Sequence, residues 1–426
     1  MEDPITTDSL TLLDGLAEEL VVKILDNFDA TEDGDLDIGD VRTLAALALT
    51  SKKYNRIATP HLYRNIINDP QGQHTPSNET LKRVFRSRPD LVAHVQSFYT
   101  RISDPAVGPI LHCIDLLSNL KHLDLRQDWG TGSLTPRVAS ADALHQILIL
   151  ALNWGTSCDN LQSLAIPTSI YPLDVIDSVC KIPKLDMLHV HIVSFYDNWH
   201  IKNAPIKTLP IKTLILTFDV GTATTFAATP CVCEDVKVLT EACPGLETFK
   251  LTDNRRMAID DMDDLFVNMT NALEKPLSRG TLRHVEIWND TKNICWPPID
   301  DRLGAVDAWT GAYGALHTLK MNTVMLFREQ DLTEISTNII PPTIRTLTLR
   351  YHRTNHPTCR VNHMEVAMEF LYTATKAGQF PELRDIAFEA TRWMGCMWLD
   401  GTGYLGRCKD LQALGIKVEL RLLSVQ

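Results

Sequence analysis

"LETFKL", from Leu246 to Leu251, is the stretch that decides the fold of this chain. It contains an apolar residue, two variable residues, an apolar residue, one variable residue and a final apolar residue. Because successive side chains of a strand point to opposite faces, Phe249 and Leu251 should share a buried face and Lys250 should lie on the other. The stretch therefore predicts a strand with one apolar and one polar face.

The same pattern recurs along most of the chain, which indicates a repeat array. Ten intervals separate the first copy at Val95 from the last at Leu411, so the mean period is about 32 residues. The further copies are "VQSFYT" from Val95, "LKHLDL" from Leu120, "LQSLAI" from Leu161, "LDMLHV" from Leu185, "IKTLIL" from Ile211, "LRHVEI" from Leu282, "LHTLKM" from Leu316, "IRTLTL" from Ile344, "LRDIAF" from Leu383 and "LQALGI" from Leu411.

These segments resemble the L-x-x-L-x-L strand of a leucine-rich repeat. The resemblance implies an irregular α/β solenoid over residues 91–426, with parallel strands on its concave side and helices on its convex side. Between copies, "SADALHQILILALNWG" from Ser140 and "HMEVAMEFLYTATKAGQ" from His363 have the apolar spacing and the length of such helices.

Cysteines support the same interpretation. Cys158, Cys243 and Cys408 each lie three residues before the first leucine of a copy, as in the cysteine-containing subtype of this repeat. In that position a thiol acts as a small buried apolar group. The ten cysteines form no C-x-x-C pair, and we expect them to be reduced in an intracellular protein.

A helical pattern precedes the array. "LDGLAEELVVKILDNF" from Leu13 has Asp14 as its expected N-cap and places four apolar residues on one helical face: Leu16, Leu20, Ile24 and Leu25. "VRTLAALALTSKKYNRIATPHLYRNI" from Val41 supplies a second apolar set. Helices of this size form a small core, so an apolar face should remain for a partner.

These helices resemble an F-box, which opens with L-P-x-E-L-x-x-x-I-L and ends with an aromatic residue and a leucine-aromatic-basic motif. Leu16, Glu19 and Leu20 match the opening, and Ala17 departs from it by replacing the usual proline. The resemblance divides the chain into a tail at 1–11, an F-box at 12–66 with an acidic inter-helix loop at 29–40, a connector at 67–90 and the repeats at 91–426. This order is that of F-box leucine-rich repeat proteins, and it looks most like the fungal members with degenerate repeats.

Members of this family are non-catalytic substrate receptors of SCF ubiquitin ligases, in which the F-box docks on a Skp-type adaptor that links to a cullin. The resemblance implies adaptor contacts at Leu16, Leu20, Ile24, Leu25, Leu44, Leu47, Leu49 and Tyr54, although the same residues could pack the helices on one another. A protein substrate would contact the residues that alternate with the buried leucines, namely His122, His189, Lys250, Glu286, Trp288, Lys320, Arg350 and Glu389.

The exposure of Trp288 stays open. Its side chain is either an exposed anchor for a partner or an aromatic ring covered by a neighbouring segment.

The function also has an alternative, a scaffold of the same architecture that works without a ligase. Ala17, in place of the usual proline, motivates this alternative. We expect no enzyme activity, because the sequence contains no G-x-S-x-G, P-loop or H-E-x-x-H motif.

Charge argues against two classes of partner. The chain of 426 residues has 41 Lys and Arg against 53 Asp and Glu, a formal net charge of −12. Binding to nucleic acid or to anionic lipid depends on neutralising anions with Lys and Arg, so we expect neither partner. The acidic start and the absence of a long apolar run predict an intracellular protein, in the cytoplasm or the nucleus.

"DATEDGDLDIGD", from Asp29 to Asp40, approaches the twelve-residue calcium loop of an EF-hand. Asp29, Asp33, Gly34 and Asp37 fit that pattern, whereas Thr31 and Asp40 depart from it at the third and twelfth positions. We interpret the stretch as an acidic insertion between F-box helices, with a calcium-responsive protein as the less favoured alternative.

Two further motifs resemble binding sites, but we expect neither of them to be one. His352, His356, Cys359 and His363 are residue types that bind zinc, but their spacing fits no zinc module, and we interpret them as part of a polar loop. "GTGYLG" from Gly401 matches the dinucleotide fingerprint literally, but too few residues follow for a crossover helix before the last repeat copy. We therefore expect no metal and no cofactor.

Overall fold

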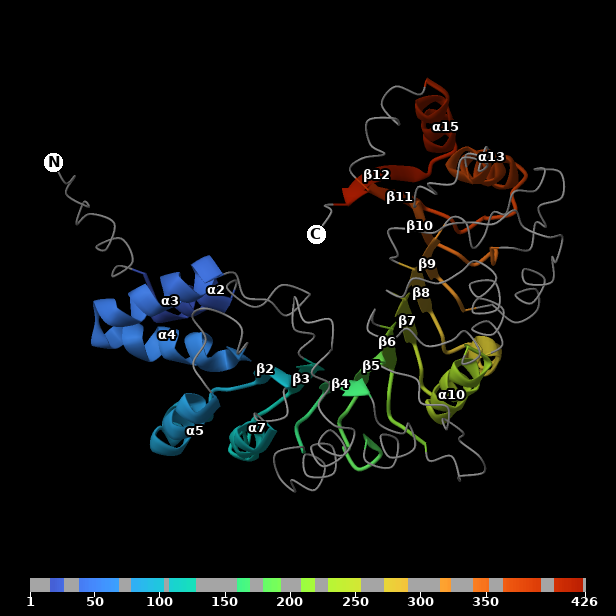
Figure 1. Ribbon diagram of the computed structural model, residues 1–426. Coiled ribbons are helices and arrows are strands. Elements are labelled where there is room, and N and C mark those ends of the chain that lie inside the picture. The colour runs from blue at the N-terminus through green and yellow to red at the C-terminus, as the bar shows by residue number, and fades with distance from the viewer. Residues whose placement is uncertain are drawn as a thin grey trace, which may run out of the picture. The chain divides into compact units, whose positions relative to one another are not determined.

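The computed structural model describes residues 16–26, 38–68, 78–102, 107–127, 159–168, 179–192, 208–218, 229–253, 272–289, 315–322, 340–351, 363–391 and 402–423. They form an α/β fold in which twelve described strands make one open sheet, ordered β1 to β12 as in the sequence (Figure 1). The strands are β1 (Asn65–Asn68), β2 (Ser97–Ile102), β3 (His122–Gln127), β4 (Ser163–Thr168), β5 (Met187–Ile192), β6 (Thr213–Phe218), β7 (Thr248–Asp253), β8 (His284–Asn289), β9 (Thr318–Asn322), β10 (Thr346–Tyr351), β11 (Asp385–Thr391) and β12 (Lys417–Leu423).

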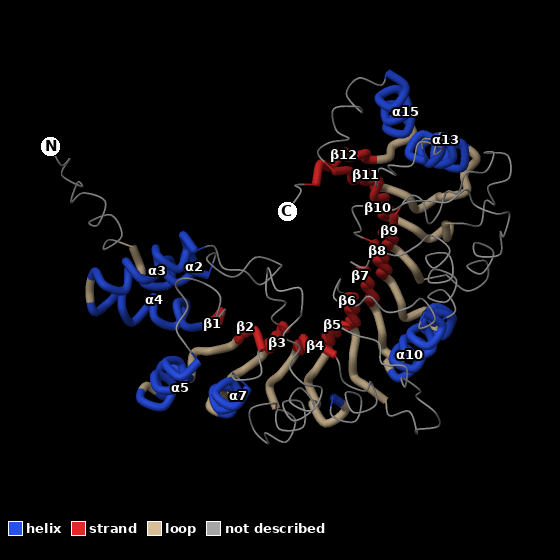
Figure 2. Tube along the Cα trace, in the orientation of Figure 1, coloured by secondary structure: helices blue, strands red, loops and turns tan. Residues whose placement is uncertain are grey.

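Helices precede and accompany the strands (Figure 2). They include α2 (Glu18–Leu25), α3 (Ile38–Thr50), α4 (Lys52–Arg64), α5 (Asn78–Ser87), α6 (Pro89–Val92), α7 (Val107–Asp115), α10 (Thr229–Ala242), α13 (His363–Lys376) and α15 (Thr402–Ala413). By compactness the chain divides into one unit over Met1–Leu164 and another over Ala165–Gln426.

The strand ladder of the second unit follows from the period-two alternation of apolar residues. β6, β7 and β8 pair in parallel, and their register aligns Leu214 with Phe249 and Phe249 with Val285. All three side chains are buried. Each buried side chain of this size stabilises the fold by roughly 1.5–3 kcal/mol relative to exposure, so the aligned apolar rows hold the ladder together.

Ten of the eleven predicted copies fall on strands, from β2 at the first copy to β11 at "LRDIAF". The prediction for the last copy, "LQALGI", is wrong. Helix α15 continues through Ala413, and β12 begins only at Lys417. Leu411 and Cys408 are buried as residues three apart on a helix, a spacing that L-x-x-L shares with the repeat strand. β1 is a further strand that the pattern does not predict.

The first unit begins with three helices around a small apolar core. α3 and α4 are separated at Ser51, whose side-chain oxygen accepts a hydrogen bond from the backbone N–H of Tyr54. That bond satisfies one of the free N–H groups at the start of α4. The core contains Val21, Leu25, Leu44, Ala48, Tyr54, Ile57 and Ala58.

The N-cap of α2 differs from the expectation. Ala17, rather than Asp14, holds the N-cap position with φ −61° and ψ 143°, and no side chain caps this helix end. Asp14 lies outside the described residues. Glu18 and Glu19 in the first turn interact favourably with the helix dipole and offset part of the missing cap.

The structure describes only some of the residues for which we predict helices or buried cysteines. Helix α13 confirms the helical prediction at "HMEVAMEFLYTATK", whereas "SADALHQILILALNWG" lies outside the described ranges. Cys243 and Cys408 are buried, as predicted, and Cys158 is not among the described residues.

None of the helices in the described part of the chain combines the length and apolarity that crossing a membrane requires.

Candidate functional site

A band of charged side chains lies on one face of strands β7 to β12, opposite the apolar rows. We call it the charged strand face. Parallel register aligns Lys250 with Glu286 and Glu286 with Lys320 in one row. It aligns Arg350 with Glu389 in a second row. Six of the eight predicted substrate contacts therefore belong to this face: Lys250, Glu286, Trp288, Lys320, Arg350 and Glu389.

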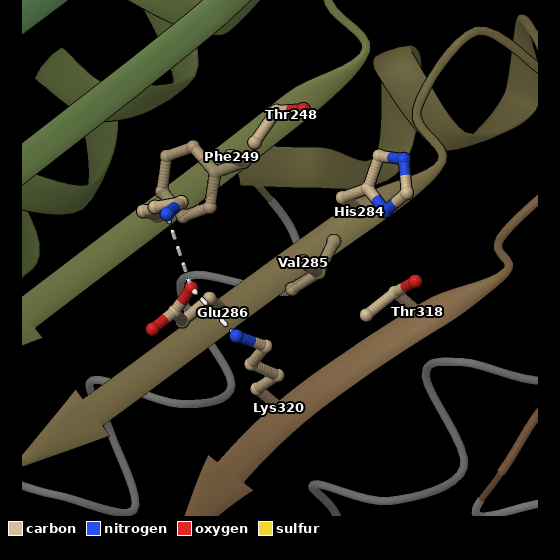
Figure 3. Close-up of a pocket in the computed structure, with 8 residues that line it drawn as sticks. Thr248, Phe249, His284, Val285, Glu286, Thr318 and Lys320 are labelled. Carbon is tan, nitrogen blue, oxygen red and sulfur yellow. Dashed lines mark ion pairs between the residues drawn. The ribbon is translucent and has the colours of Figure 1, made fainter. Parts of the chain in front are cut away.

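Glu286 is the centre of the first cluster (Figure 3). Its carboxylate lies 3.5 Å from the ammonium of Lys250 and 3.8 Å from that of Lys320, on the two neighbouring strands. The indole Nε1–H of Trp288 also donates a hydrogen bond to it. Two cations share one carboxylate here, so this cluster carries an excess of positive charge.

A shallow pocket of about 230 Å³ opens beside this cluster. Thr248, His284 and Thr318 line it together with Lys250 and Lys320 (Figure 3). Phe249, Val285 and the carboxylate of Glu286 line it as well, so hydrogen-bond donors and acceptors stand beside apolar side chains, and the lining suits a small group with both polar and apolar parts.

His284 is the titratable group of this pocket with a displaced pKa. Partial burial lowers that pKa below the usual 6.5, and the neighbouring His317, Arg283 and Lys250 lower it further. Each of these disfavours the imidazolium form. At neutral pH His284 is therefore a neutral hydrogen-bonding group.

Trp288 joins the first cluster to the second. The residue is 4% exposed, so of the two interpretations left open for Trp288 the exposed anchor is excluded. The guanidinium of Arg350 covers the ring at 4.1 Å from its centroid. Arg350 reaches Trp288 from two strands away because the β9 residue aligned with Arg350 is Asn322, which has a short side chain. The alternative interpretation, a covered aromatic ring, describes this position.

Glu389 anchors the second cluster. The Arg350 Nη2 lies 3.1 Å from its carboxylate, and the Arg421 Nη1 on β12 lies 3.6 Å from it. Arg421 and Lys417 also pair with Glu419, and both cations lower the pKa of that carboxyl group. The last strand therefore extends the charged strand face.

The predicted site lacks three residues of β12: Lys417, Glu419 and Arg421. The sequence pattern puts the last copy at Leu411, four residues too early in the chain to include them. The alternation of Val418 and Leu420 in "KVELRLL" is the signal that could have found them.

The remaining two predicted contacts lie apart from these clusters. His189 on β5 is hydrogen-bonded to the Thr217 hydroxyl at 2.9 Å, and its ring lies 3.9 Å from that of His191. His122 lies on β3 in the first unit and is half-buried. The structure thus connects six of the eight residues and leaves two outside the clusters.

The predicted adaptor contacts fall into three groups according to how exposed they are. Leu25, Leu44 and Tyr54 are buried in the core, which favours the alternative that these residues pack the helices on one another. Leu16 and Leu47 are half-buried against that core. The exposed members are Leu20 at 49%, Ile24 at 44% and Leu49 at 86%, and Val41, outside the predicted set, is 37% exposed.

The other motifs provide no site within the described ranges. Gly401 lies outside them, and Thr402 to Gly406 belong to α15, a helix of 12 residues, so the expectation that too few residues follow this motif for a helix is wrong. His352, His356, Cys359 and most of the acidic stretch lie outside the described residues, whereas Asp40 belongs to α3. Among the described residues, no three His, Cys, Asp or Glu side chains are grouped to hold a metal ion.

No family model matches this sequence, and no curated protein matches it.

Proposed function

We propose that this protein is a non-catalytic substrate receptor of an SCF-type ubiquitin ligase. In this proposal residues 12–66 form an F-box that docks on a Skp-type adaptor and through it on a cullin. Residues 91–426 form a leucine-rich-repeat solenoid that holds a protein substrate. The observation that carries the proposal is one combination: helices α2 to α4 with exposed leucines, followed by a long parallel strand ladder with the charged strand face.

The exposed apolar residues support the adaptor half of the proposal. Leu20 and Ile24 are one helical turn apart on α2, so they form one stripe on its solvent side. A small helical unit gains nothing in its own core from Leu49, which is 86% exposed. An apolar stripe of this kind suits a helix-against-helix contact with a partner.

The charged strand face supports the substrate half. Its carboxylates are held by cations from neighbouring strands, which fixes the side chains in advance of binding. Preorganised charged groups give specificity by electrostatic complementarity and by the cost of a mismatched charge. Such a face suits recognition of a protein surface.

Adaptor copurification tests the proposal. Wild-type chain should retain a Skp-type adaptor, and Leu20→Asp plus Ile24→Asp should lose it, because two charges would be buried in an apolar contact. Leu420→Asp in β12 is the matched control, because that leucine is also exposed but lies in the other unit. Absence of adaptor from the wild-type preparation contradicts the receptor function.

A scaffold without a ligase is the second candidate, and the end of α2 favours it. Ala17 leaves this helix without a side-chain cap, which weakens the first turn that the adaptor would contact. Ala17→Asp should restore a cap and stabilise α2 by about 1 kcal/mol. If the wild-type chain fails to bind adaptor and this variant binds it, the scaffold function is favoured.

A further inference from the structure

The pocket beside Glu286 is built from two rows of side chains on three neighbouring strands (Figure 3). Parallel register of β7, β8 and β9 gives a charged row: Lys250, Glu286 and Lys320. Two residues earlier on each strand it gives a neutral row: Thr248, His284 and Thr318. Because residues two apart on a strand share a face, the pocket offers ion-pairing groups beside hydrogen-bonding groups.

The excess positive charge of the charged strand face lies at this pocket. Lys250 and Lys320 share the single carboxylate of Glu286. The other charged side chains of this face within the described strands β7 to β12 balance one another, three cations against three carboxylates: Arg350, Lys417, Arg421, Asp385, Glu389 and Glu419. Glu247 and Arg283, which precede β7 and β8, also cancel. An anionic group of a partner is therefore drawn to the pocket rather than to the rest of the face.

The two ammonium groups can bind a further acceptor. Both lie near the same oxygen, Glu286 Oε2, at 3.5 Å for Lys250 and 3.8 Å for Lys320. These distances are longer than the roughly 2.7–3.2 Å of an N–H···O hydrogen bond. The side chains are 43% and 36% exposed. Since an ammonium group has several N–H donors, both lysines can reach one incoming carboxylate while they stay near Glu286.

Glu286 limits the charge that the pocket accepts. Its other oxygen, Oε1, accepts the indole N–H of Trp288, which holds the carboxylate in place. Glu286 therefore cancels one of the two lysine charges. One carboxylate from a partner neutralises the cluster, whereas a phosphate group with two negative charges would place an excess of negative charge beside Glu286.

The neutral row suits the backbone of a peptide. Threonine hydroxyls both donate and accept hydrogen bonds, and His284, whose pKa is lowered, offers one donor and one acceptor nitrogen at neutral pH. Each peptide group likewise has one donor and one acceptor. Phe249 and Val285 line the same pocket and can contact the methylenes of a glutamate. A volume of about 230 Å³ admits an extended segment with one side chain rather than a helix.

We propose that this pocket binds an extended, acidic segment of the protein substrate. A glutamate carboxylate of that segment pairs with Lys250 and Lys320, and its backbone forms hydrogen bonds with Thr248, His284 and Thr318. The inference rests on the proposed function and adds to it the chemistry of the substrate segment.

Calorimetry with the purified full chain tests this assignment. The probe is a short peptide with blocked termini whose only charge is a central glutamate, and its counterpart has glutamine at that position. At about 50 mM salt the glutamate peptide should bind at least about tenfold more tightly, and the difference should shrink at about 500 mM as screening increases. Equal affinity of the wild type for the two peptides overturns the inference.

Neutral substitutions of the two lysines locate the binding. Lys250→Gln plus Lys320→Gln should lower the affinity for the glutamate peptide to that for the glutamine peptide. Lys181→Gln plus Lys184→Gln is the matched control, because these lysines are exposed in the same unit and do not line the pocket. An equal loss in both double variants, or in neither, contradicts binding at Lys250 and Lys320.

Glu286→Gln should have the opposite effect. It removes the competing carboxylate but keeps an oxygen for the Trp288 N–H, so the glutamate peptide should bind about three- to tenfold more tightly. Affinity for the glutamine peptide should stay constant. Weaker binding of the glutamate peptide to this variant would show that its carboxylate does not lie beside Glu286.

Two further outcomes separate the chemistry and the function. A peptide with phosphoserine in place of glutamate that binds the wild type more tightly, through the same two lysines, overturns the assignment to a carboxylate. No adaptor is present in these measurements. A wild type that prefers the glutamate peptide but binds no Skp-type adaptor supports the pocket assignment and refutes the receptor function, whereas adaptor binding without a peptide preference overturns only the inference.

Discussion

The guanidinium of Arg350 on β10 lies over the ring of Trp288 on β8, 4.1 Å from the ring centroid. The same arginine pairs with Glu389 on β11, and the indole N–H of Trp288 donates to Glu286. Two side chains from non-adjacent strands thus connect both charged clusters. This contact connects the two clusters of the charged strand face into one network of side chains.

Truncation of Trp288 should therefore be costly. Trp288→Ala removes a large buried side chain and should lower the free energy of unfolding by about 3–5 kcal/mol. Combined with Arg350→Ala in a double-mutant cycle, the coupling energy should be about 1–2 kcal/mol, as for a shielded cation–π contact. Urea unfolding measures both. A coupling energy of zero would show that the two side chains act independently.

Substitutions of Glu286 should separate its charge from its role as a hydrogen-bond acceptor. Glu286→Gln keeps an oxygen for the Trp288 N–H and should change stability by less than about 1 kcal/mol, because the two lysine pairs are partly exposed. Glu286→Ala leaves the buried N–H without this acceptor and should cost about 1–3 kcal/mol. Equal unfolding midpoints for the two variants in urea would contradict this assignment.

Acidification should destabilise the fold through His284. Its pKa is lowered in the folded state, so below about pH 6.5, the ordinary histidine pKa, the unfolded chain binds the proton more tightly. Stability contributed by neutral His284 is present above that pH and is lost as pH falls toward the lowered pKa. His284→Gln should reduce the shift of the urea midpoint between pH 7.5 and 5.5, measured as a difference from wild type. An unchanged shift would exclude His284 as a contributor.

Thiol reactivity should follow burial. Burial raises the pKa of Cys243 to about 12 and that of Cys113 to about 11, so their reactive thiolate forms are scarce at pH 8. Cys180 is half-buried. Of Cys113, Cys180, Cys243 and Cys408, Cys180 should be labelled first by a disulfide reagent, as located by mass spectrometry. Early labelling of Cys243 in the folded protein would contradict the packing role assigned to its position.

Local patterns predicted most of the sheet because a half-buried strand records its two faces in alternate residues. "LETFKL" and nine other copies all lie on strands. The last copy failed because Leu411 and Leu414 are spaced as a helix allows, and local sequence does not decide between the two periods. The prediction of strand faces brought together Lys250, Glu286 and Lys320 without knowledge of their distances.

Exposure could not be predicted in the same way because it depends on contacts distant in sequence. Trp288 is covered by Arg350, which is 62 positions later in the chain. Leu20 and Leu25 lie in the same helical motif. Packing against α3 and α4 buries Leu25, whereas Leu20 stays exposed. The sequence pattern therefore named the helices of a candidate adaptor site but did not separate its core from its surface.

Complex formation with the adaptor is the most direct test of the receptor function. Purified full chain mixed with recombinant Skp-type adaptor should elute as a 1:1 complex in size-exclusion chromatography with light scattering, and Leu20→Asp plus Ile24→Asp should elute as separate proteins. Failure of the wild-type chain to form any complex at micromolar concentration, with its helicity intact, would contradict the account.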